Sequence, residues 1–237
     1  MTMLAGMRVN TLLRGSLTLC LAAGCGMDVD ETSSPADVPP GVGEVEQSLT
    51  TVTGVDFEDY DAGPLGAPWQ VARSLDTQAS IERTSDHGNV LFVQGSAAAG
   101  DFVLARLDTS TPSDLVASVD VKPDSDSSFI WSIHTPRYKS RIRLQRWPGS
   151  ARLVATAPGS GDADCGSLPA GQWSNLSLVV HTNPSVTFDV LLDGNPTPCQ
   201  DIEANLTPPF TLVQLNDFSA EGWGGNVRFD NVRVLAP

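Results

Sequence analysis

The clearest alternation of apolar and polar positions lies in residues 173–194. Every second position in its two halves is apolar, namely Leu176, Leu178, Val180, Val186, Phe188, Val190 and Leu192. A period of two places such side chains on one face of a β-strand. Gly194, which follows Asp193, reaches positive φ without steric cost and favours a tight turn after the second strand. The segment therefore predicts a hairpin of two half-buried strands.

From about residue 50, short apolar runs recur at intervals of roughly 8 to 12 residues, separated by Gly, Pro, Asp and Ser. No segment has the long 3.6-residue period of a capped helix. Besides the hairpin, the expected strands are 51–57, 70–73, 79–83, 89–94, 102–107, 114–121, 128–134, 138–146, 151–157, 210–215 and 226–235. Half-buried strands need a second apolar layer. The sequence therefore predicts an all-β fold, a two-sheet antiparallel β-sandwich, as one domain over residues 50–237.

Residues 1–24 differ in composition from the rest of the chain. Residues 1–24 carry two arginines, then an apolar run that ends in small residues, which is typical of a secretion signal. The run Leu-Ala-Ala-Gly before Cys25 resembles the bacterial lipobox, although Ala22 stands where Leu is usual. That resemblance implies a signal peptide over 1–24 and lipidation of Cys25, with simple secretion as the alternative. Gly26 lacks the acid of an inner-membrane retention signal, so we expect an outer-membrane lipoprotein of the cell envelope.

Residues 25–49 are rich in Asp, Glu, Ser, Pro and Gly and poor in large apolar residues. Such a composition cannot bury a core and predicts a flexible linker. A lipobox followed by such a linker resembles exported proteins of myxobacteria. The chain has 14 Lys and Arg and 28 Asp and Glu. Cleavage of the signal peptide would remove two arginines, so the net charge of the mature chain is 12 − 28 = −16. Such a charge repels nucleic acid, and we expect the lipid anchor to be the only contact with the membrane.

Two further cysteines flank the hairpin, Cys165 before it and Cys199 after it. In an oxidising compartment such a pair predicts a disulfide, and no CxxC or Cys/His spacing favours zinc. The bridge would close a loop of roughly 35 residues and stabilise the domain by about 3 to 4 kcal/mol.

The domain contains three short recognisable sequence motifs, one near each end, in residues 55–60 and 227–234, and one in residues 172–194. Together they resemble the concanavalin A-like (jelly-roll) lectin/glucanase domains and similar carbohydrate-binding modules. The resemblance implies a jelly roll, a glycan partner and a structural Ca²⁺ shared by Glu58 and Asp230. The alternative is that both are solvated turn acids. The apolar alternation of the last strand breaks at Asp230-Asn231, which predicts a β-bulge.

A row of cations lies in residues 137–143. Alternate positions are basic at Arg137, Lys139, Arg141 and Arg143, and the aromatic residues Trp131, His134 and Trp147 border them. On a strand these cations would line one face over about 20 Å. Arginine forks match carboxylate or sulfate, and Trp packs on sugar rings, so the row predicts a binding site for an anionic or polyhydroxy glycan. The alternative is a solvent face paired with acids of neighbouring strands.

The hypothesis that the protein is an enzyme rests on Ser132-Ile133-His134, which resembles the Q-I/V-H motif of jelly-roll polysaccharide lyases. Ser132 replaces the Gln of that motif, and Tyr138 is the one tyrosine near it. No E-x-D-x-E pattern of retaining glycosidases occurs. We therefore interpret the chain as a non-catalytic, lectin-like carbohydrate-binding protein. The alternatives are a polysaccharide lyase or glycoside hydrolase using His134, Tyr138 and Arg141, or a protein-binding adhesion module.

Overall fold

The computed structural model describes residues 50–74, 77–95, 103–111, 114–125, 127–137, 140–215 and 225–236. They belong to a compact unit, Glu46–Pro237. The predicted signal peptide, Cys25 and the linker over 25–49 lie outside the described residues, as do Tyr138 and Lys139.

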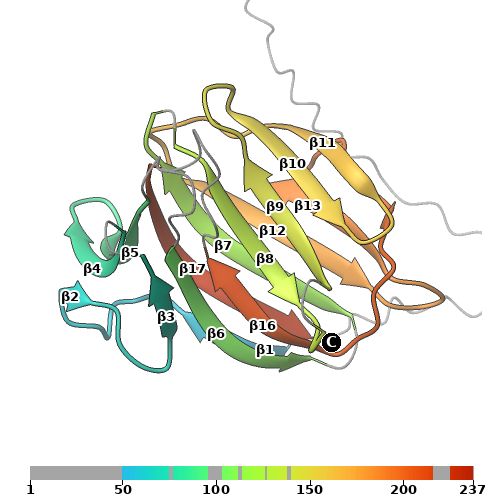
Figure 1. Cartoon of the computed structure of the whole chain (residues 1–237), viewed down its shortest axis with the longest axis horizontal. Helices are drawn as coiled ribbons and strands as arrows, with labels where there is room; N and C mark the ends of the chain where they lie inside the picture. Colours follow the sequence, from blue (N-terminus) through green and yellow to red (C-terminus); the bar gives the residue numbers. More distant parts are fainter. Residues whose placement is uncertain are drawn as a thin grey trace, which may run out of the picture. The chain divides into compact units, whose positions relative to one another are not determined.

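The described strands form two antiparallel sheets (Figure 1). The larger sheet contains β1 (Thr50–Val55), β2 (Gly63–Pro64), β4 (Gln78–Thr84), β5 (Gly88–Gln94), β7 (Leu115–Pro123), β12 (Ser174–His181), β13 (Thr187–Leu192), β14 (Asn195–Pro196), β15 (Ile202–Glu203) and β17 (Asn226–Ala236). The smaller sheet contains β3 (Gln70–Arg73), β6 (Val103–Thr111), β8 (Phe129–His134), β9 (Arg141–Arg146), β10 (Arg152–Ala157), β11 (Gly161–Ser167) and β16 (Phe210–Leu215).

The order of the strands defines the two layers. The ten-stranded sheet runs β14-β13-β12-β7-β17-β5-β4-β2, with β1 also pairing with β17 and β15 with β13. The seven-stranded sheet runs β11-β10-β9-β8-β16-β6-β3. No helix occurs among the described residues. In the same part of the chain, no helix has the length and hydropathy needed to cross a membrane.

A single hydrophobic core lies between the sheets. The predicted hairpin is confirmed, because β12 pairs with β13 from Leu176 opposite Leu192 to His181 opposite Thr187. The inward residues Leu176, Leu178, Val180, Phe188 and Val190 are fully buried, and Leu192 is partly buried. Phe129 on β8 meets Phe229 on β17 edge to face, with ring centroids 5.8 Å apart. Since β8 and β17 belong to different sheets, this contact joins the two layers, and the predicted β-sandwich is confirmed.

The predicted bulge in the last strand is also confirmed. The register between β17 and β7 shifts between Asp230 and Arg233. Asn231 has a φ of 47°, and Asn tolerates this left-handed conformation better than most residues. Its side-chain Nδ2 donates to Asp120 Oδ2 at 2.8 Å. The extra residue lets Phe229, Val232 and Val234 all face the core.

The predicted strand 138–146 is wrong at its beginning, because β9 starts at Arg141. Ser140 N donates to Arg137 O, and Thr135 N donates to Ser140 O, both at 2.9 Å. These bonds place Arg137 in the turn between β8 and β9. The predicted stripe of four cations along one strand is therefore corrected to two positions on β9, Arg141 and Arg143.

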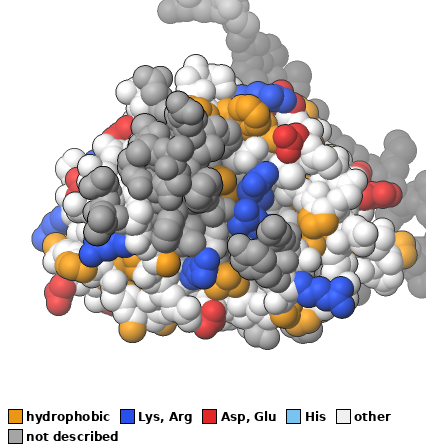
Figure 2. Space-filling model, in the orientation of Figure 1, with side chains coloured by type: hydrophobic (Ala, Val, Ile, Leu, Met, Phe, Trp, Pro, Cys, Tyr) orange, Lys and Arg blue, Asp and Glu red, His pale blue; other side chains and the backbone are white. Residues whose placement is uncertain are grey.

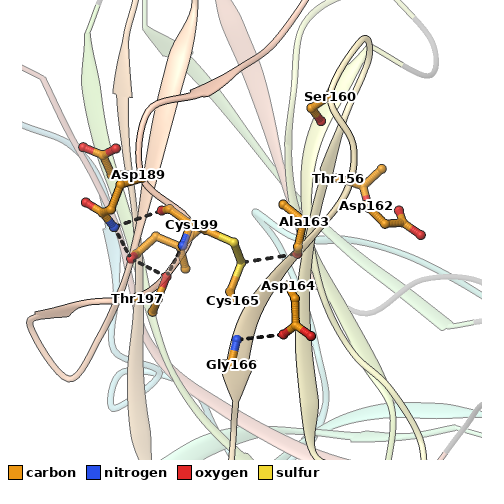
Figure 3. The surroundings of a disulfide bond; sticks show 12 residues. Thr156, Ser160, Asp162, Ala163, Asp164, Cys165, Gly166, Asp189, Thr197 and Cys199 are labelled. Atoms are coloured by element: carbon orange, nitrogen blue, oxygen red, sulfur yellow. Dashed lines mark hydrogen bonds between the residues drawn. A yellow bond between two sulfur atoms is a disulfide. The ribbon is translucent and has the colours of Figure 1, made fainter.

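The predicted disulfide is confirmed (Figure 3). Cys165 lies on β11, the edge strand of the seven-stranded sheet, and Cys199 lies between β14 and β15 beside the ten-stranded sheet. Their Cα atoms are 5.0 Å apart. Cys199 O also accepts from Val190 N on β13 at 2.9 Å. The bridge thus links the edges of the two layers.

Candidate functional site

The candidate site is the outer face of the seven-stranded sheet. Ile142 and Leu144 on β9 point into the core, so the alternating positions Arg141 and Arg143 project from the opposite face. The same alternation on β8 puts His134 on the outer face. Figure 2 views the molecule in the orientation of Figure 1 and shows Lys and Arg side chains spread across the middle of the visible surface.

Strand register brings polar residues of all seven strands into one line. From β11 to β3, each residue is the Cα partner of the next: Asp162, Thr156, Arg143, Ser132, Gln214, Arg106 and Gln70. We call these residues the polar row. Six spacings between strands give the polar row a length of roughly 29 Å. It runs across the strands, whereas the sequence predicted a stripe along one strand.

The centre of the polar row holds an unused hydrogen-bond donor. Gln214 is 2% exposed, and its Oε1 accepts from Arg106 Nε at 3.1 Å. Its Nε2 is also buried and has no hydrogen-bond partner among the described residues. A buried amide donor without a partner is costly, so such groups in folded proteins usually have an explanation.

Beside Gln214, Ser132 is fully buried and forms a hydrogen bond with His134. The Ser132 Oγ and His134 Nε2 atoms are 2.9 Å apart, and the imidazole tautomer decides which atom donates. On β9, Arg143 is the partner of Ser132 and Arg141 is the partner of His134. Two cations and an imidazole therefore lie next to one another on adjacent strands.

The β11 end of the polar row is acidic. Asp162 Oδ1 accepts from Thr156 Oγ1 at 2.7 Å. On the same strand, Asp164 accepts from Gly166 N at 3.0 Å and from Arg152 Nε at 2.8 Å. The Gly166 amide first, and Arg152 second, lower the pKa of Asp164 below its usual value, because both stabilise the carboxylate.

The other end of the polar row lies on β6 and β3. Gln70 Nε2 donates to Asp108 Oδ2 at 3.3 Å. Asp108 is on β6, two positions from Arg106, and therefore also on the outer face. Acidic side chains thus lie toward both ends of the polar row, Asp162 on β11 and Asp108 on β6.

The predicted ligand-binding residues separate into three groups. His134, Arg141 and Arg143 lie together on the outer face. Arg137 is exposed in the turn before β9, and Trp147 lies beyond the end of β9, 5.7 Å from the Arg152 guanidinium. The prediction for Trp131 is wrong: it is fully buried in the core, because it alternates with Ser132 along β8 and so faces inward.

Sequence reasoning missed Arg106 and Gln214. Arg106 lies between the buried Ala105 and Leu107, and Gln214 lies between the buried Val213 and Leu215. The available signal was this alternation, since a polar residue between two inward-facing ones must lie on the outer face.

The predicted calcium ligands bind protein donors. Glu58 Oε1 accepts from Asn89 N at 3.1 Å. Asp230 pairs with His87, with 3.1 Å between Oδ2 and Nδ1, and its Oδ1 accepts from Asn231 N at 2.7 Å. Burial raises the pKa of Asp230. The described residues contain no cluster of three or more His, Cys, Asp or Glu arranged to hold a metal. The structural calcium stays a prediction.

The sandwich of two antiparallel sheets is a jelly roll of the concanavalin A-like and galectin-like type. It matches an endo-β-1,4-glucuronan lyase from the fungus Trichoderma reesei, at 12% identity and a TM-score of 0.57, over 79% of this chain and 96% of that one. It also matches SCLam, an endo-β-1,3(4)-glucanase of family GH16, at 12% identity and a TM-score of 0.55, over 79% and 91%.

A third match is a protein with a galectin-like fold from Bacillus subtilis, at 10% identity and a TM-score of 0.52, over 79% and 97%. The chain also matches a sialidase, of which it spans only 16%. At these identities the likenesses establish the fold alone. No protein-family model matches the sequence, and no curated protein matches it.

Proposed function

We propose that this domain binds an acidic polysaccharide along the polar row without cleaving it. The observation that carries the proposal is the alignment of Arg143 and Arg106 in one cross-strand row, on either side of the uncharged Ser132 and Gln214. Hydroxyl, carbonyl and carboxylate oxygens of a glycan are acceptors for arginine N–H groups. Arg106 and Arg143, one on each side, match carboxylate or sulfate groups with their planar forks.

The shape and surroundings of the row support an extended ligand. Its length of roughly 29 Å suits a chain that crosses the sheet. The fold neighbours include proteins whose names place them on glucuronan and on β-1,3(4)-glucan. Because of these neighbours, polysaccharide is the class of ligand to test first.

The central strands favour binding over hydrolysis. β8, β9 and β16 carry no Asp or Glu. Glycoside hydrolysis needs two carboxyl groups flanking the scissile bond, about 5 Å apart in retaining enzymes. With arginine, serine and glutamine in those places, the middle of the sheet offers hydrogen bonds and positive charge to a glycan.

The proposal also includes the cellular localisation of the protein. The lipobox-like run before Cys25 and the acidic residues 25–49 support a lipid-anchored protein of the outer membrane with a flexible linker. A change of Cys25→Ala should abolish incorporation of labelled palmitate and release the protein into the soluble fraction. Unchanged labelling would contradict lipidation at this cysteine.

Binding is tested by two variants and a matched control. Arg143→Ala and Arg106→Ala should each weaken retention on an acidic polysaccharide in affinity electrophoresis by about tenfold, because each removes a charge-assisted contact of about 1.5 kcal/mol. Arg233→Ala removes the same charge from an exposed position on β17, outside the polar row, and should leave retention unchanged. Equal retention by all three variants would remove the polar row as the binding surface.

A polysaccharide lyase is the second candidate, favoured by His134. Its imidazole lies on the outer face beside Arg141 and the polar row, where it could accept the proton next to a uronate carboxylate. A lyase would release unsaturated uronates, which absorb in the ultraviolet. Accumulation of that absorbance with the wild type, and its loss in His134→Ala, would replace binding by catalysis as the function of this face.

A further inference from the structure

The outer face of the ten-stranded sheet carries four adjacent aliphatic side chains. Val116 on β7 has Val179 on β12 and Leu235 on β17 as its Cα partners, and Leu191 on β13 is the partner of Ser177, two positions from Val179. The four side chains alternate with inward-facing residues along their strands and are partly exposed. Among the described residues that form the core or pack against it, none of the four occurs. We call these four residues the apolar patch.

The apolar patch lies where the described part of the domain begins. Thr51 on β1 is the Cα partner of Leu235, and Val52, the next residue, is 38% exposed. Between Cys25 and Thr50 the sequence has 24 residues. A flexible linker of that length has an end-to-end distance of roughly 25 to 30 Å. An acyl chain on Cys25 therefore keeps the patch within reach of a bilayer.

Building on the lipid anchor of the proposed function, we infer that the apolar patch docks on the surface of the membrane that holds the anchor. Its aliphatic side chains enter the boundary between lipid headgroups and acyl chains, as the apolar faces of peripheral proteins do. Arg233 is exposed on β17, two positions before Leu235, where its guanidinium can bind a lipid phosphate. Weak docking is sufficient, because the linker holds the lipid at a high effective concentration.

The charge of the protein selects the kind of lipid. The mature chain has a net charge of 12 − 28 = −16, so anionic headgroups repel it. Asp189 borders the apolar patch as the partner of Val179. Its side chain is 22% exposed, and its Oδ1 accepts from Asp201 N at 2.7 Å. The surface that fits the apolar patch is therefore a zwitterionic phospholipid.

Docking through the ten-stranded sheet leaves the polar row free. The outer faces of the two sheets point away from the shared core in opposite directions. A domain that lies on the membrane through its ten-stranded sheet therefore presents its seven-stranded sheet to the surroundings. The anchored protein can bind lipid and polysaccharide at the same time.

Flotation with vesicles tests the docking. The protein is the mature chain with Cys25→Ala, which keeps the whole compact unit and has neither signal peptide nor acyl group. It should float with vesicles of phosphatidylethanolamine and phosphatidylcholine at millimolar lipid, and less when phosphatidylglycerol is added. Val52→Ser and Leu235→Ser should each lower the partition coefficient by about threefold to tenfold, because each removes apolar surface from the contact. Excess acidic polysaccharide should leave flotation unchanged.

The matched control is Val71→Ser, because Val71 is 37% exposed but lies on β3 in the seven-stranded sheet. It should float like the parent chain. No flotation of the parent, an equal loss in Val71→Ser, or unchanged flotation of both patch variants would overturn the inference. A dimer that both patch variants dissociate would also overturn it, since a second copy would then cover the patch. Failure of the proposed function is seen separately, as missing palmitate on the unaltered Cys25 or missing retention on polysaccharide.

Discussion

Replacing both cysteines of the Cys165–Cys199 bridge by alanine tests how the two sheets are held together at their edges. The bridge spans 34 positions of sequence, including the β12–β13 hairpin. In the chain-entropy model, closing a loop of that length stabilises the folded state by about 3.8 kcal/mol at 25 °C. For a domain of this size, the midpoint of thermal unfolding should fall by about 8 to 15 °C.

The loss should be felt most on β11. This edge strand pairs with β10 alone, and Cys165 is its one buried residue. Without the bridge, little apolar burial holds the strand in place. Amide hydrogen exchange should therefore accelerate in residues 161–167 well before it does in the hairpin.

Urea and thermal unfolding of the oxidised wild type and of the Cys165→Ala/Cys199→Ala variant measure the global effect. Reduced wild type is the matched control, because it keeps both sulfur atoms and loses only the covalent link. It should unfold at nearly the midpoint of the double variant. A loss below about 1 kcal/mol, together with unchanged exchange in 161–167, would refute the reasoning, because β11 would then be held by contacts other than the bridge.

Three further changes test the core, a carboxylate and the bulge. Phe188→Ala should lower the free energy of unfolding by about 3 to 5 kcal/mol in urea titrations, because Phe188 is fully buried; a loss below 1 kcal/mol would contradict this. The hydrogen bonds from Thr182 Oγ1 and N to Asp114 lower the pKa of Asp114 in the folded protein. The ionised carboxylate therefore stabilises the fold at pH values above the pKa of the unfolded chain. This stabilisation is lost as the pH falls through the lowered pKa of the folded state. Asp114→Ala should therefore cost about 1 to 2 kcal/mol at pH 7 and progressively less as the pH falls through the lowered pKa, and a cost that does not change with pH would refute the assignment. At Asn231, with its φ of 47°, Val should cost more than Gly by about 1 to 2 kcal/mol in thermal unfolding, and equal costs would mean that the backbone conformation does not matter there.

Much of the fold could be predicted because its strands follow the alternation that burial imposes. The hairpin and the bulge after Asp230 were both visible, the first as an unbroken period of two and the second as its interruption. The edge strand β11 was missed because it buries only Cys165 and has no alternation to show. The beginning of β9 was misplaced because backbone bonds of the Thr135–Ser140 turn, which leave no mark on side-chain chemistry, decide it.

The site could be predicted only in part, since it depends on which strands are neighbours. Period two places Arg141 and Arg143 on one face, but it does not reveal that β16 and β6 follow β8 in the sheet. That adjacency brings Gln214 and Arg106 next to Ser132 from distant parts of the sequence. Trp131 was misjudged because an aromatic residue near a cluster of cations resembles a sugar platform, whereas its parity along β8 directs it inward.

The place of β17 in the ten-stranded sheet has a consequence for biosynthesis. The last strand of the sandwich in sequence order sits between β7 and β5 and also pairs with β1. Before β17 is synthesised, β7 can pair with β12 and β5 can pair with β4, but no strand joins these two parts of the sheet. The ten-stranded sheet is therefore completed only when its final strand emerges, and pairing segments so distant in sequence slows folding.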